Sequence, residues 1–296
     1  MKAFTITEEE VRAWLPERDP AGHKGSFGHV LSVCGSLHYP GAAVLAALGA
    51  AHCGAGLVTA AFPECAYPAV AAGLTVSPLL PLPANRQGTF RVSALPPLRK
   101  ALEGKNALLL GCGLGLNGDT KELVRALWEE TELPIVLDAD GINAAAAHMH
   151  VGQWKTRSSR ALPVWTPHPG EMARLTGRSV EEIQGRRADI ALEFARTHNA
   201  VLVLKGAGTV VASPERDCVY RCDTGNSGLA KGGSGDLLAG MLAALLAQGM
   251  DSFRAALCAV YLHGKAADHA AARYSLRGMT ALDCVEALKT LLSEYE

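Results

Sequence analysis

Short apolar runs without polar alternation recur along the chain and set the strongest limit on its fold. Runs that are apolar on both faces predict strands covered on both sides, and helical patterns fall between them. This alternation is typical of βαβ units and indicates an α/β fold with a central, mostly parallel sheet flanked by helices. The candidate strands are residues 30–34, 57–61, 107–110, 134–137, 163–166 and 200–204, and the candidate helices are 42–53, 120–129, 141–147 and 180–198.

The remaining patterns extend this fold without interrupting it. Residues 209–212 and 218–222 flank a turn-rich segment, 213–217, which predicts a small hairpin at the edge of the sheet. From Asp236 onward the pattern is helical to the end. The alternation never breaks for a linker, and 49% hydrophobic residues allow a sizeable core. We therefore expect residues 1–296 to form one domain.

Composition narrows the class of partner. The formal net charge is -1, and no run of Lys or Arg is interleaved with aromatic residues, so a small molecule is favoured over nucleic acid. Residues 41–62 carry no charge, but they are rich in Ala and Gly, contain His52 and break at residues 54–56, which argues against a membrane span. The eight scattered cysteines form no CxxC pair, and the start of the chain carries neither a signal-peptide core nor a transit pattern, so we expect reduced core cysteines and a cytoplasmic protein.

Ligands in an open α/β sheet bind beyond the carboxyl ends of the strands, so the loops that follow strands are the candidate site. Two of these loops, residues 35–41 and 111–115, are rich in glycine. Neither matches the P-loop pattern, and the glycines of 111–115 do not have the dinucleotide spacing GxGxxG. The sequence therefore disfavours both a P-loop enzyme and a Rossmann dehydrogenase.

Polar side chains follow three later strands. Asp138 and Asp140 could hold water or a hydrated Mg²⁺, with helix capping by Asp140 as the alternative. His168, between two prolines, and Glu171 are expected to face the crevice. Residues 205–209 offer Lys205, a glycine-rich backbone and a hydroxyl, which suit nucleotide phosphates, although a hairpin turn with a solvated lysine is the simpler interpretation.

A glycine cluster precedes the first C-terminal helix. Gly232, Gly233 and Gly235 stand directly before Asp236, after which apolar residues recur at helical spacing. The free N–H groups and positive dipole end of such a helix can bind an anion. A tight loop, with Asp236 merely favourable in the first helical turn, is the other interpretation, and the local sequence does not choose between them.

Taken together, these motifs resemble the ADP-dependent (S)-NAD(P)H-hydrate dehydratase family of the ribokinase-like superfamily. The matching segments occur in family order from about Thr7 to the C-terminus. They are residues 23–28, 41–43, 54–58, 111–115, 138–140, 166–171, 205–209 and 225–240.

The resemblance implies a ribokinase-like fold and a hydro-lyase that repairs hydrated NADH and NADPH (NADHX and NADPHX). In that family ADP phosphorylates the ring hydroxyl of the S epimer, and loss of phosphate restores the dihydronicotinamide, leaving AMP and phosphate. It further implies Mg²⁺ as cofactor, a homotetramer, and an NAD(P)HX epimerase as functional partner. The epimerase domain that relatives often carry at the N-terminus is not expected within residues 1–296.

The resemblance also assigns roles to residues. Asp236 would be the general base, and the backbone of Gly232, Gly233, Ser234 and Gly235 would form an anion hole for the phosphoryl group in transit. Glu171 would help to organise Mg²⁺ through water. The hydrated dinucleotide would contact Ala42, Gly113 or Gly115, His168 and Asp236. The adenine nucleotide would contact Lys205, Gly206, Ala207, Gly208, Thr209 and Gly235.

Four residues depart from the family pattern, of which Ser234 in place of threonine is conservative. Cys112 and Ser227 stand where proline is expected, and Lys231 stands where Thr or Ser is usual, beside the anion site, where it could alter nucleotide affinity. A second hypothesis is a kinase of the same superfamily that acts on hydroxyethylthiazole or hydroxymethylpyrimidine, and a third is a nucleotide sensor without catalysis. Neither the choice of ADP or ATP nor that of NADHX or NADPHX follows from the residues.

Overall fold

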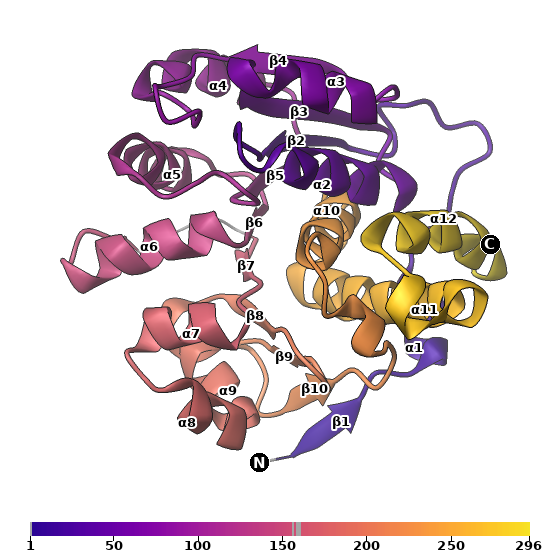
Figure 1. The fold of residues 1–296 in the computed structure, drawn as a ribbon. Coiled ribbons are helices and arrows are strands. Elements are labelled where there is room, and N and C mark those ends of the chain that lie inside the picture. Colours follow the sequence, from indigo (N-terminus) through magenta and orange to yellow (C-terminus); the bar gives the residue numbers. More distant parts are fainter. Residues whose placement is uncertain (1, 156, 158–160) are drawn as a thin grey trace.

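The computed structural model describes residues 2–155, 157 and 161–296, and within them a ten-stranded sheet lies between two layers of helices (Figure 1). The strand order is β1-β10-β9-β8-β7-β6-β5-β2-β3-β4. All neighbours from β8 to β4 are parallel, whereas β9 is antiparallel to both β8 and β10. The strands are β1 (Ala3–Thr5), β2 (His29–Val33), β3 (Leu57–Pro63), β4 (Leu79–Leu82), β5 (Ala107–Leu110), β6 (Ile135–Leu137), β7 (Val164–Trp165), β8 (Val201–Leu204), β9 (Val210–Ala212) and β10 (Val219–Arg221).

The strands are apolar on both sides because each side of the sheet has its own core. In β5, Leu109 packs into the core on one side, while Leu108 and Leu110 pack into the core on the other. The first core includes α1 (Glu8–Trp14), α2 (Pro40–His52), α3 (Tyr67–Gly73), α10 (Ser234–Ala247), α11 (Ser252–Gly278) and α12 (Ala281–Leu291). The second includes α4 (Leu95–Leu102), α5 (Gly118–Glu130), α6 (Asp140–His150), α7 (Pro169–Thr176), α8 (Val180–Gly185) and α9 (Arg187–His198).

Helices α2 and α10 approach each other so closely that glycine is required at their contact. A Cβ atom on Gly49 would lie 2.4 Å from the carbonyl oxygen of Leu237, and one on Gly240 would lie 2.0 Å from that of Ala46. The uncharged stretch 41–62 is therefore most of α2 followed by β3, packed inside the protein. Among the described residues, none of the helices combines the length and the apolarity needed to cross a membrane.

The structure confirms the predicted α/β class and corrects several details. The helix expected over 180–198 is two helices, because the backbone at Arg186 leaves the helical region between α8 and α9. The predicted hairpin is β9 and β10, but the edge of the sheet is β1, which pairs with β10 in parallel. Strand β4 was not predicted. Among the cysteines, Cys65 is exposed and is not the core residue expected from the sequence.

Candidate active site

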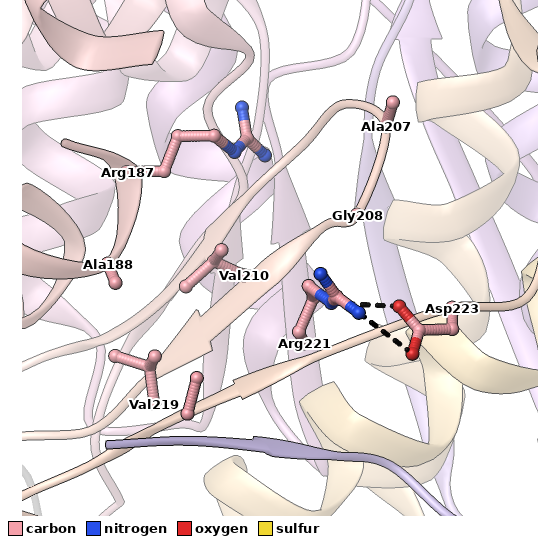
Figure 2. A pocket seen from close by; sticks show the side chains of 9 residues that line it. Arg187, Ala188, Ala207, Gly208, Val210, Val219, Arg221 and Asp223 are labelled. Carbon is pink, nitrogen blue, oxygen red and sulfur yellow. Dashed lines mark hydrogen bonds and ion pairs between the residues drawn. The ribbon is translucent and has the colours of Figure 1, made fainter. Parts of the chain in front are cut away.

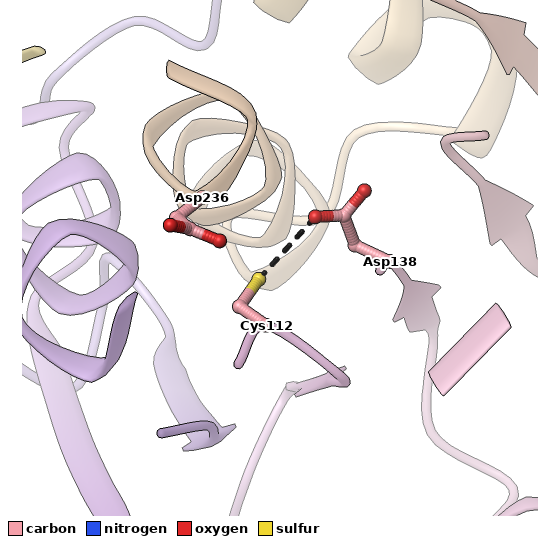
Figure 3. A group of neighbouring side chains, drawn as sticks. All are labelled: Cys112, Asp138 and Asp236. Carbon is pink, nitrogen blue, oxygen red and sulfur yellow. Dashed lines mark hydrogen bonds between the residues drawn. The ribbon is translucent and has the colours of Figure 1, made fainter. Parts of the chain in front are cut away.

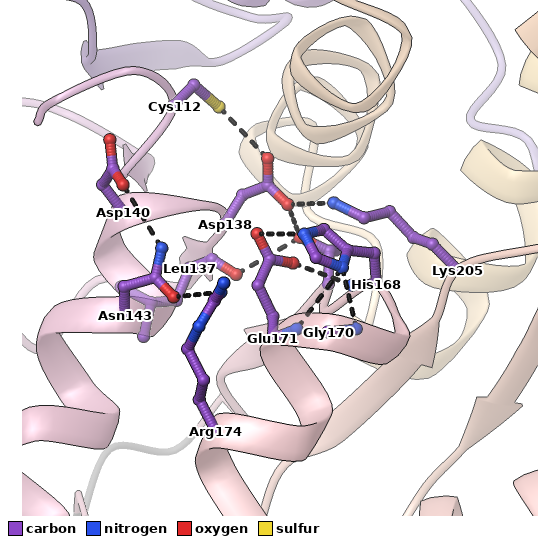
Figure 4. Close-up of polar contacts among 11 residues, drawn as sticks. Cys112, Leu137, Asp138, Asp140, Asn143, His168, Gly170, Glu171, Arg174 and Lys205 are labelled. Carbon is purple, nitrogen blue, oxygen red and sulfur yellow. Dashed lines mark hydrogen bonds and ion pairs between the residues drawn. The ribbon is translucent and has the colours of Figure 1, made fainter. Parts of the chain in front are cut away.

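The polar strand ends meet at one edge of the sheet, beside the N-terminus of α10 (Figure 4). Strands β2, β5, β6, β7 and β8 are consecutive neighbours in parallel pairing, so their carboxyl ends lie side by side. The residues following them supply Cys112, Asp138, His168 and Lys205. The separate motifs therefore lie close enough together to form one site.

Asp138 is at the centre of this site and is 1% exposed. Its Oδ1 accepts hydrogen bonds from Lys205 Nζ at 2.5 Å and from Thr166 Oγ1 at 2.6 Å. Its Oδ2 faces the Cys112 thiol, with 3.5 Å between oxygen and sulfur. Asp138 is therefore the ion-pair partner of the Lys205 ammonium. The sequence had been interpreted differently, with Asp138 as a carboxylate that holds water or Mg²⁺.

Ala139 and Asp140, which follow Asp138, help to hold the loop after β5 in place. Ala139 has φ 50°, a strained conformation for a residue with a Cβ. Asp140 does not cap α6, because it is the first residue of that helix and the N-cap is Ala139. Its Oδ2 instead accepts the Gly115 N–H at 2.8 Å. The strained turn thus places Asp140 so that it holds the glycine-rich loop that the sequence assigns to substrate.

That loop lies against the start of α2. Gly113 has φ 64°, and a Cβ there would lie 2.7 Å from the Cβ of Ala42 and 2.8 Å from that of Tyr39. Ala42 itself is 8% exposed. The residues assigned to substrate from two distant segments are thus in contact, and a side chain larger than hydrogen at Gly113 would force these segments apart.

Helix α10 begins with its glycines where an anion could reach them. The helix starts at Ser234, and its N-cap, Gly233, has φ 92° and contributes no side chain. Ser234 and Gly235 therefore form the first helical positions, with Gly232 and Gly233 just before them. A Cβ on Gly235 would lie 3.3 Å from Lys205 Nζ. The free N–H groups of the first turn and the Lys205 ammonium are thus neighbours.

Asp236 lies in the first turn of α10. Burial raises the pKa of its carboxyl group to about 6, and Asp138 adds to the rise, while Lys205 opposes it. For Lys205 itself, burial would lower the pKa, but Asp138 and Glu171 outweigh that effect and the pKa is raised. A carboxylate that titrates near neutral pH beside a permanent cation is suited to accept a proton.

His168 and Glu171 form a reciprocal cap on α7. His168 Nδ1 accepts the N–H groups of Gly170 and Glu171, and Glu171 Oε2 accepts the His168 N–H at 2.8 Å. Glu171 is 4% exposed, and burial raises its pKa to about 7. The His168 side chain remains half exposed. Nδ1 is used by the cap and Nε2 lies 3.3 Å from Glu171 Oε1, so a ligand could reach His168 at the exposed part of its ring.

The conformation of the loop 205–209 depends on its glycines and on hydrogen bonds from Arg187, a residue that the sequence did not single out. Gly206 and Gly208 have φ 143° and 64°. Arg187 Nη2 donates to the carbonyl oxygens of Leu204 and Lys205, at 2.8 and 3.3 Å. The loop is therefore not a simple turn with a solvated lysine, because Lys205 points inward to Asp138.

A cavity of about 420 Å³ adjoins this loop on the α9 side of the sheet (Figure 2). Arg187 and Arg221 face it, and Arg221 is paired with Asp223 at 2.8 Å. The rest of the lining is small and mainly apolar. Arg187 follows a helix break and Arg221 ends a strand, and neither position carries a sequence signal that distinguishes it from an ordinary surface arginine.

The segment before the anion site is anchored to α11 by residues that motif analysis also missed. Asp268 accepts the Gly225 N–H at 3.0 Å and the Asn226 side-chain N–H at 2.9 Å. His263, one turn earlier in α11, is 7% exposed, and burial lowers its pKa to about 4, so it is neutral. His263 and Asp268 are five positions apart and therefore lie on different faces of α11, so helical periodicity in the sequence gives no signal that groups them.

Lys231 does not point at the anion site. Its Nζ donates to the carbonyl oxygens of Arg277 and Met279, where α11 gives way to α12. Of the other departures, Ser227 opens a short 3-10 turn, Ser227–Leu229, and is exposed. Lys231 thus ties the anion-hole segment to the end of α11.

We expect Lys231→Ala to change the Kd of the adenine nucleotide by less than about threefold. Loss of a direct charged hydrogen bond to phosphate would cost about 1.5–3 kcal/mol, which is more than tenfold. Isothermal titration with ADP and Mg²⁺ measures this, with Lys205→Ala as the variant that should lose affinity. A loss of tenfold or more in Lys231→Ala would mean that its ammonium turns to the phosphate.

The sheet order, together with a glycine-rich helix start followed by a carboxylate, defines a ribokinase-like protein. The same fold is seen in a ribokinase-like superfamily protein from Enterococcus faecalis, with TM-score 0.83, 21% identity, and 99% and 96% of the two chains covered. A family model described as NAD(P)H-hydrate dehydratase matches residues 30–290. The chain belongs to the NAD(P)H-hydrate dehydratase family.

Two relatives and one solved structure place the chain within this family. It is 36% identical to the ADP-dependent (S)-NAD(P)H-hydrate dehydratase of Bacillus subtilis over 98% of both chains. The crystal structure of the ADP/ATP-dependent NAD(P)H-hydrate dehydratase from Bacillus subtilis, co-crystallized with ATP/Mg²⁺, matches all of both chains with TM-score 0.85 and 33% identity. The bifunctional NAD(P)H-hydrate repair enzyme of Moorella thermoacetica is 42% identical over 98% of this chain but 54% of its own length. The chain thus spans about half the length of such bifunctional relatives.

Proposed function

We propose that the protein dehydrates the S form of hydrated NADH and NADPH, using ADP as phosphoryl donor and releasing AMP and phosphate. The observation that carries this proposal is the position of Asp236 in the first turn of α10, directly after Ser234 and Gly235, where the Lys205 ammonium also lies close to the backbone. Family membership supports the choice of substrate. We also propose that residues 1–296 act as one domain, in the cytoplasm, as a homotetramer and in concert with an NAD(P)HX epimerase.

The proposed chemistry assigns one task to each group. Asp236 accepts the proton of the ring hydroxyl as that oxygen attacks the terminal phosphorus of ADP, and AMP leaves. The backbone N–H groups of residues 232–235 stabilise the charge on the transferring phosphoryl group. Loss of phosphate from one ring carbon and of a proton from its neighbour then restores the double bond of the dihydronicotinamide. Ala42, Gly113, Gly115 and His168 would hold the dinucleotide.

The nucleotide would lie along residues 205–209, with Gly235 near its phosphates. Mg²⁺ would neutralise the phosphate charge when bound. Glu171 accepts the His168 N–H with one oxygen and lies 3.3 Å from His168 Nε2 with the other. It belongs to no group of three ligating side chains among the residues that the structure describes. This suits a carboxylate that reaches Mg²⁺ through water, with nucleotide phosphates supplying the direct ligands.

The test is recovery of NADH absorbance from chemically hydrated NADH. Purified protein is incubated with Mg²⁺ and either ADP or ATP, side by side, and AMP and free phosphate are measured. Recovery with equimolar phosphate release is the expected result, and absence of recovery with both nucleotides would overturn the proposal. A stable phosphorylated product would indicate a small-molecule kinase, such as one acting on hydroxyethylthiazole, and absence of nucleotide turnover with either substrate would indicate a sensor.

Activity is expected to fall as the pH drops through about 6, the value to which burial and Asp138 raise the pKa of Asp236. A general base must be deprotonated, so kcat/KM should fall about tenfold per pH unit below that value. The same carboxylate costs stability above its folded pKa, and this cost is relieved as the pH falls through about 6 toward the unfolded value of about 3.9. A profile of kcat/KM that is flat across this range would contradict the base role.

The pH profile also has a matched control. Burial raises the pKa of Glu171 to about 7, so its protonation can add a second, higher limb. In Glu171→Gln the upper limb should vanish and the limb near 6 should remain. If the limb near 6 vanishes in this variant, it belongs to Glu171 and not to Asp236.

A further inference from the structure

The proposed base Asp236 has two neighbours, the Cys112 thiol and the Asp138 carboxylate, to which the proposed reaction assigns no step. Cys112 follows β5, Asp138 follows β6, and Asp236 lies in α10 (Figure 3). One ligand atom from each lies within 4.8 Å of the other two. Cys112 and Asp138 are 0% and 1% exposed. Sulfur and carboxylate oxygens thus converge from three separate elements of the fold.

We propose that Cys112, Asp138 and Asp236 bind a thiophilic divalent cation, of the Zn²⁺, Cd²⁺ or Co²⁺ class. Borderline metals accept thiolate and carboxylate together, whereas Mg²⁺ requires oxygen ligands in an octahedron. With bonds of about 2.3 Å to sulfur and 2.1 Å to oxygen, two ligands of a tetrahedral site lie about 3.6 Å apart. Cys112 Sγ and Asp138 Oδ2 are 3.5 Å apart, so this edge of the site is already formed.

The two oxygens of Asp138 are used differently, which leaves one free for a cation. Oδ1 accepts hydrogen bonds from both Lys205 and Thr166, while among the described residues Oδ2 receives only the weak thiol donor of Cys112. A cation on Oδ2 therefore does not require the ion pair with Lys205 to break.

The charge of the cluster matches a divalent cation. When the metal binds, the S–H bond of Cys112 breaks, its proton passes to solvent, and a sulfur–metal bond forms. The thiolate and two carboxylates then outweigh the Lys205 ammonium and the partial positive charge of the α10 N-terminus.

This cation site and the proposed base role exclude each other. A metal bound to Asp236 would prevent that carboxylate from accepting a proton, a consequence that rests on the proposed function. Binding itself does not rest on it, because the ligand set is defined by distance and burial alone. The resemblance to the family implies a proline at this position, and this chain has Cys112 instead.

The test is titration of the purified, nucleotide-free full chain with Co²⁺ as a spectroscopic probe. We expect a near-ultraviolet thiolate-to-cobalt charge-transfer band that saturates at one Co²⁺ per chain. Cys112→Ser should abolish the band. Asp236→Asn, which conserves volume, should weaken Co²⁺ affinity by about tenfold or more. Even substitutions of residues that only support metal ligands typically cost about tenfold, and loss of a ligand should cost at least as much. Cys53→Ser is the matched control and should leave the band unchanged, because Cys53 is buried beside Cys258 and belongs to no group of three ligating side chains among the described residues.

Several outcomes would overturn the proposal. They are absence of the band in the unaltered chain, its persistence in Cys112→Ser, and its equal loss in Cys53→Ser. Displacement of Co²⁺ by equimolar Mg²⁺ would also do so, because it would indicate an all-oxygen site. Circular dichroism and the unfolding temperature of each variant show whether it is folded, and Cys112→Ala replaces Cys112→Ser if the latter is not.

Discussion

Asp236→Asn is expected to lower kcat by about 10²–10⁴-fold, the range that a general base contributes. Asn has nearly the same shape as Asp but cannot take the proton of the attacking hydroxyl. The first turn of α10 provides its N–H groups from the backbone, so the nucleotide site remains intact in the variant. The Kd of ADP, measured by titration calorimetry, should therefore change by less than about threefold, which is well below the effect on kcat.

Asp140→Asn is the matched control for this experiment. Asp140 lies two residues beyond Asp138 and accepts the Gly115 N–H, a hydrogen bond that an amide oxygen can also accept. Its variant should raise the KM of the hydrated dinucleotide and leave kcat within about tenfold, the effect of a residue that only positions a loop. Near-normal turnover in Asp236→Asn would remove that residue from the base role, and an equal loss of ADP affinity would reassign it to binding.

The fold was readable from the sequence where burial on both faces dictated residue type. Strands such as β5 and β8 have continuous apolar runs because each of their sides faces a core. Strands β1 and β4 were missed because they lie at the two edges of the sheet, where one side of the ladder is unpaired and burial is weaker. The break at Arg186 was missed because the apolar spacing of α8 continues into α9 without a proline.

The candidate site could be predicted as a set of loops but not as a set of contacts. That strand ends meet at one edge follows from topology, so the sequence brought Asp138, His168 and Lys205 together. Their pairing could not be derived, because Lys205 could equally face solvent, phosphate or a carboxylate 67 positions away. For the same reason Lys231, adjacent to the anion site in sequence, was expected near the nucleotide but donates to α11.

Lys205→Met is expected to reduce the free energy of unfolding by about 3–5 kcal/mol, the cost of removing one partner of a buried ion pair. Asp138 is 1% exposed and the Lys205 side chain 17%, so water can replace only part of the lost interaction at Asp138. Thr166 would be left as the other close donor to Asp138 Oδ1 among the described residues. Urea unfolding at neutral pH, monitored by far-ultraviolet circular dichroism, measures the change.

A double-mutant cycle separates the energy of the Asp138–Lys205 interaction from the cost of leaving one buried charge unpaired. The double variant Asp138→Asn, Lys205→Met leaves no unpaired ion. Its loss of unfolding free energy should therefore be smaller than the sum of the losses in the two single variants, with a coupling energy of about 1–3 kcal/mol. Arg99→Met is the matched control, since Arg99 and Glu130 lie 2.6 Å apart but are 49% and 40% exposed, and its effect should be far smaller. Additive losses would show that Asp138 and Lys205 stabilise the protein independently. In that case their 2.5 Å contact serves mainly to aim the ammonium at the first turn of α10, where the Gly235 backbone lies beside it.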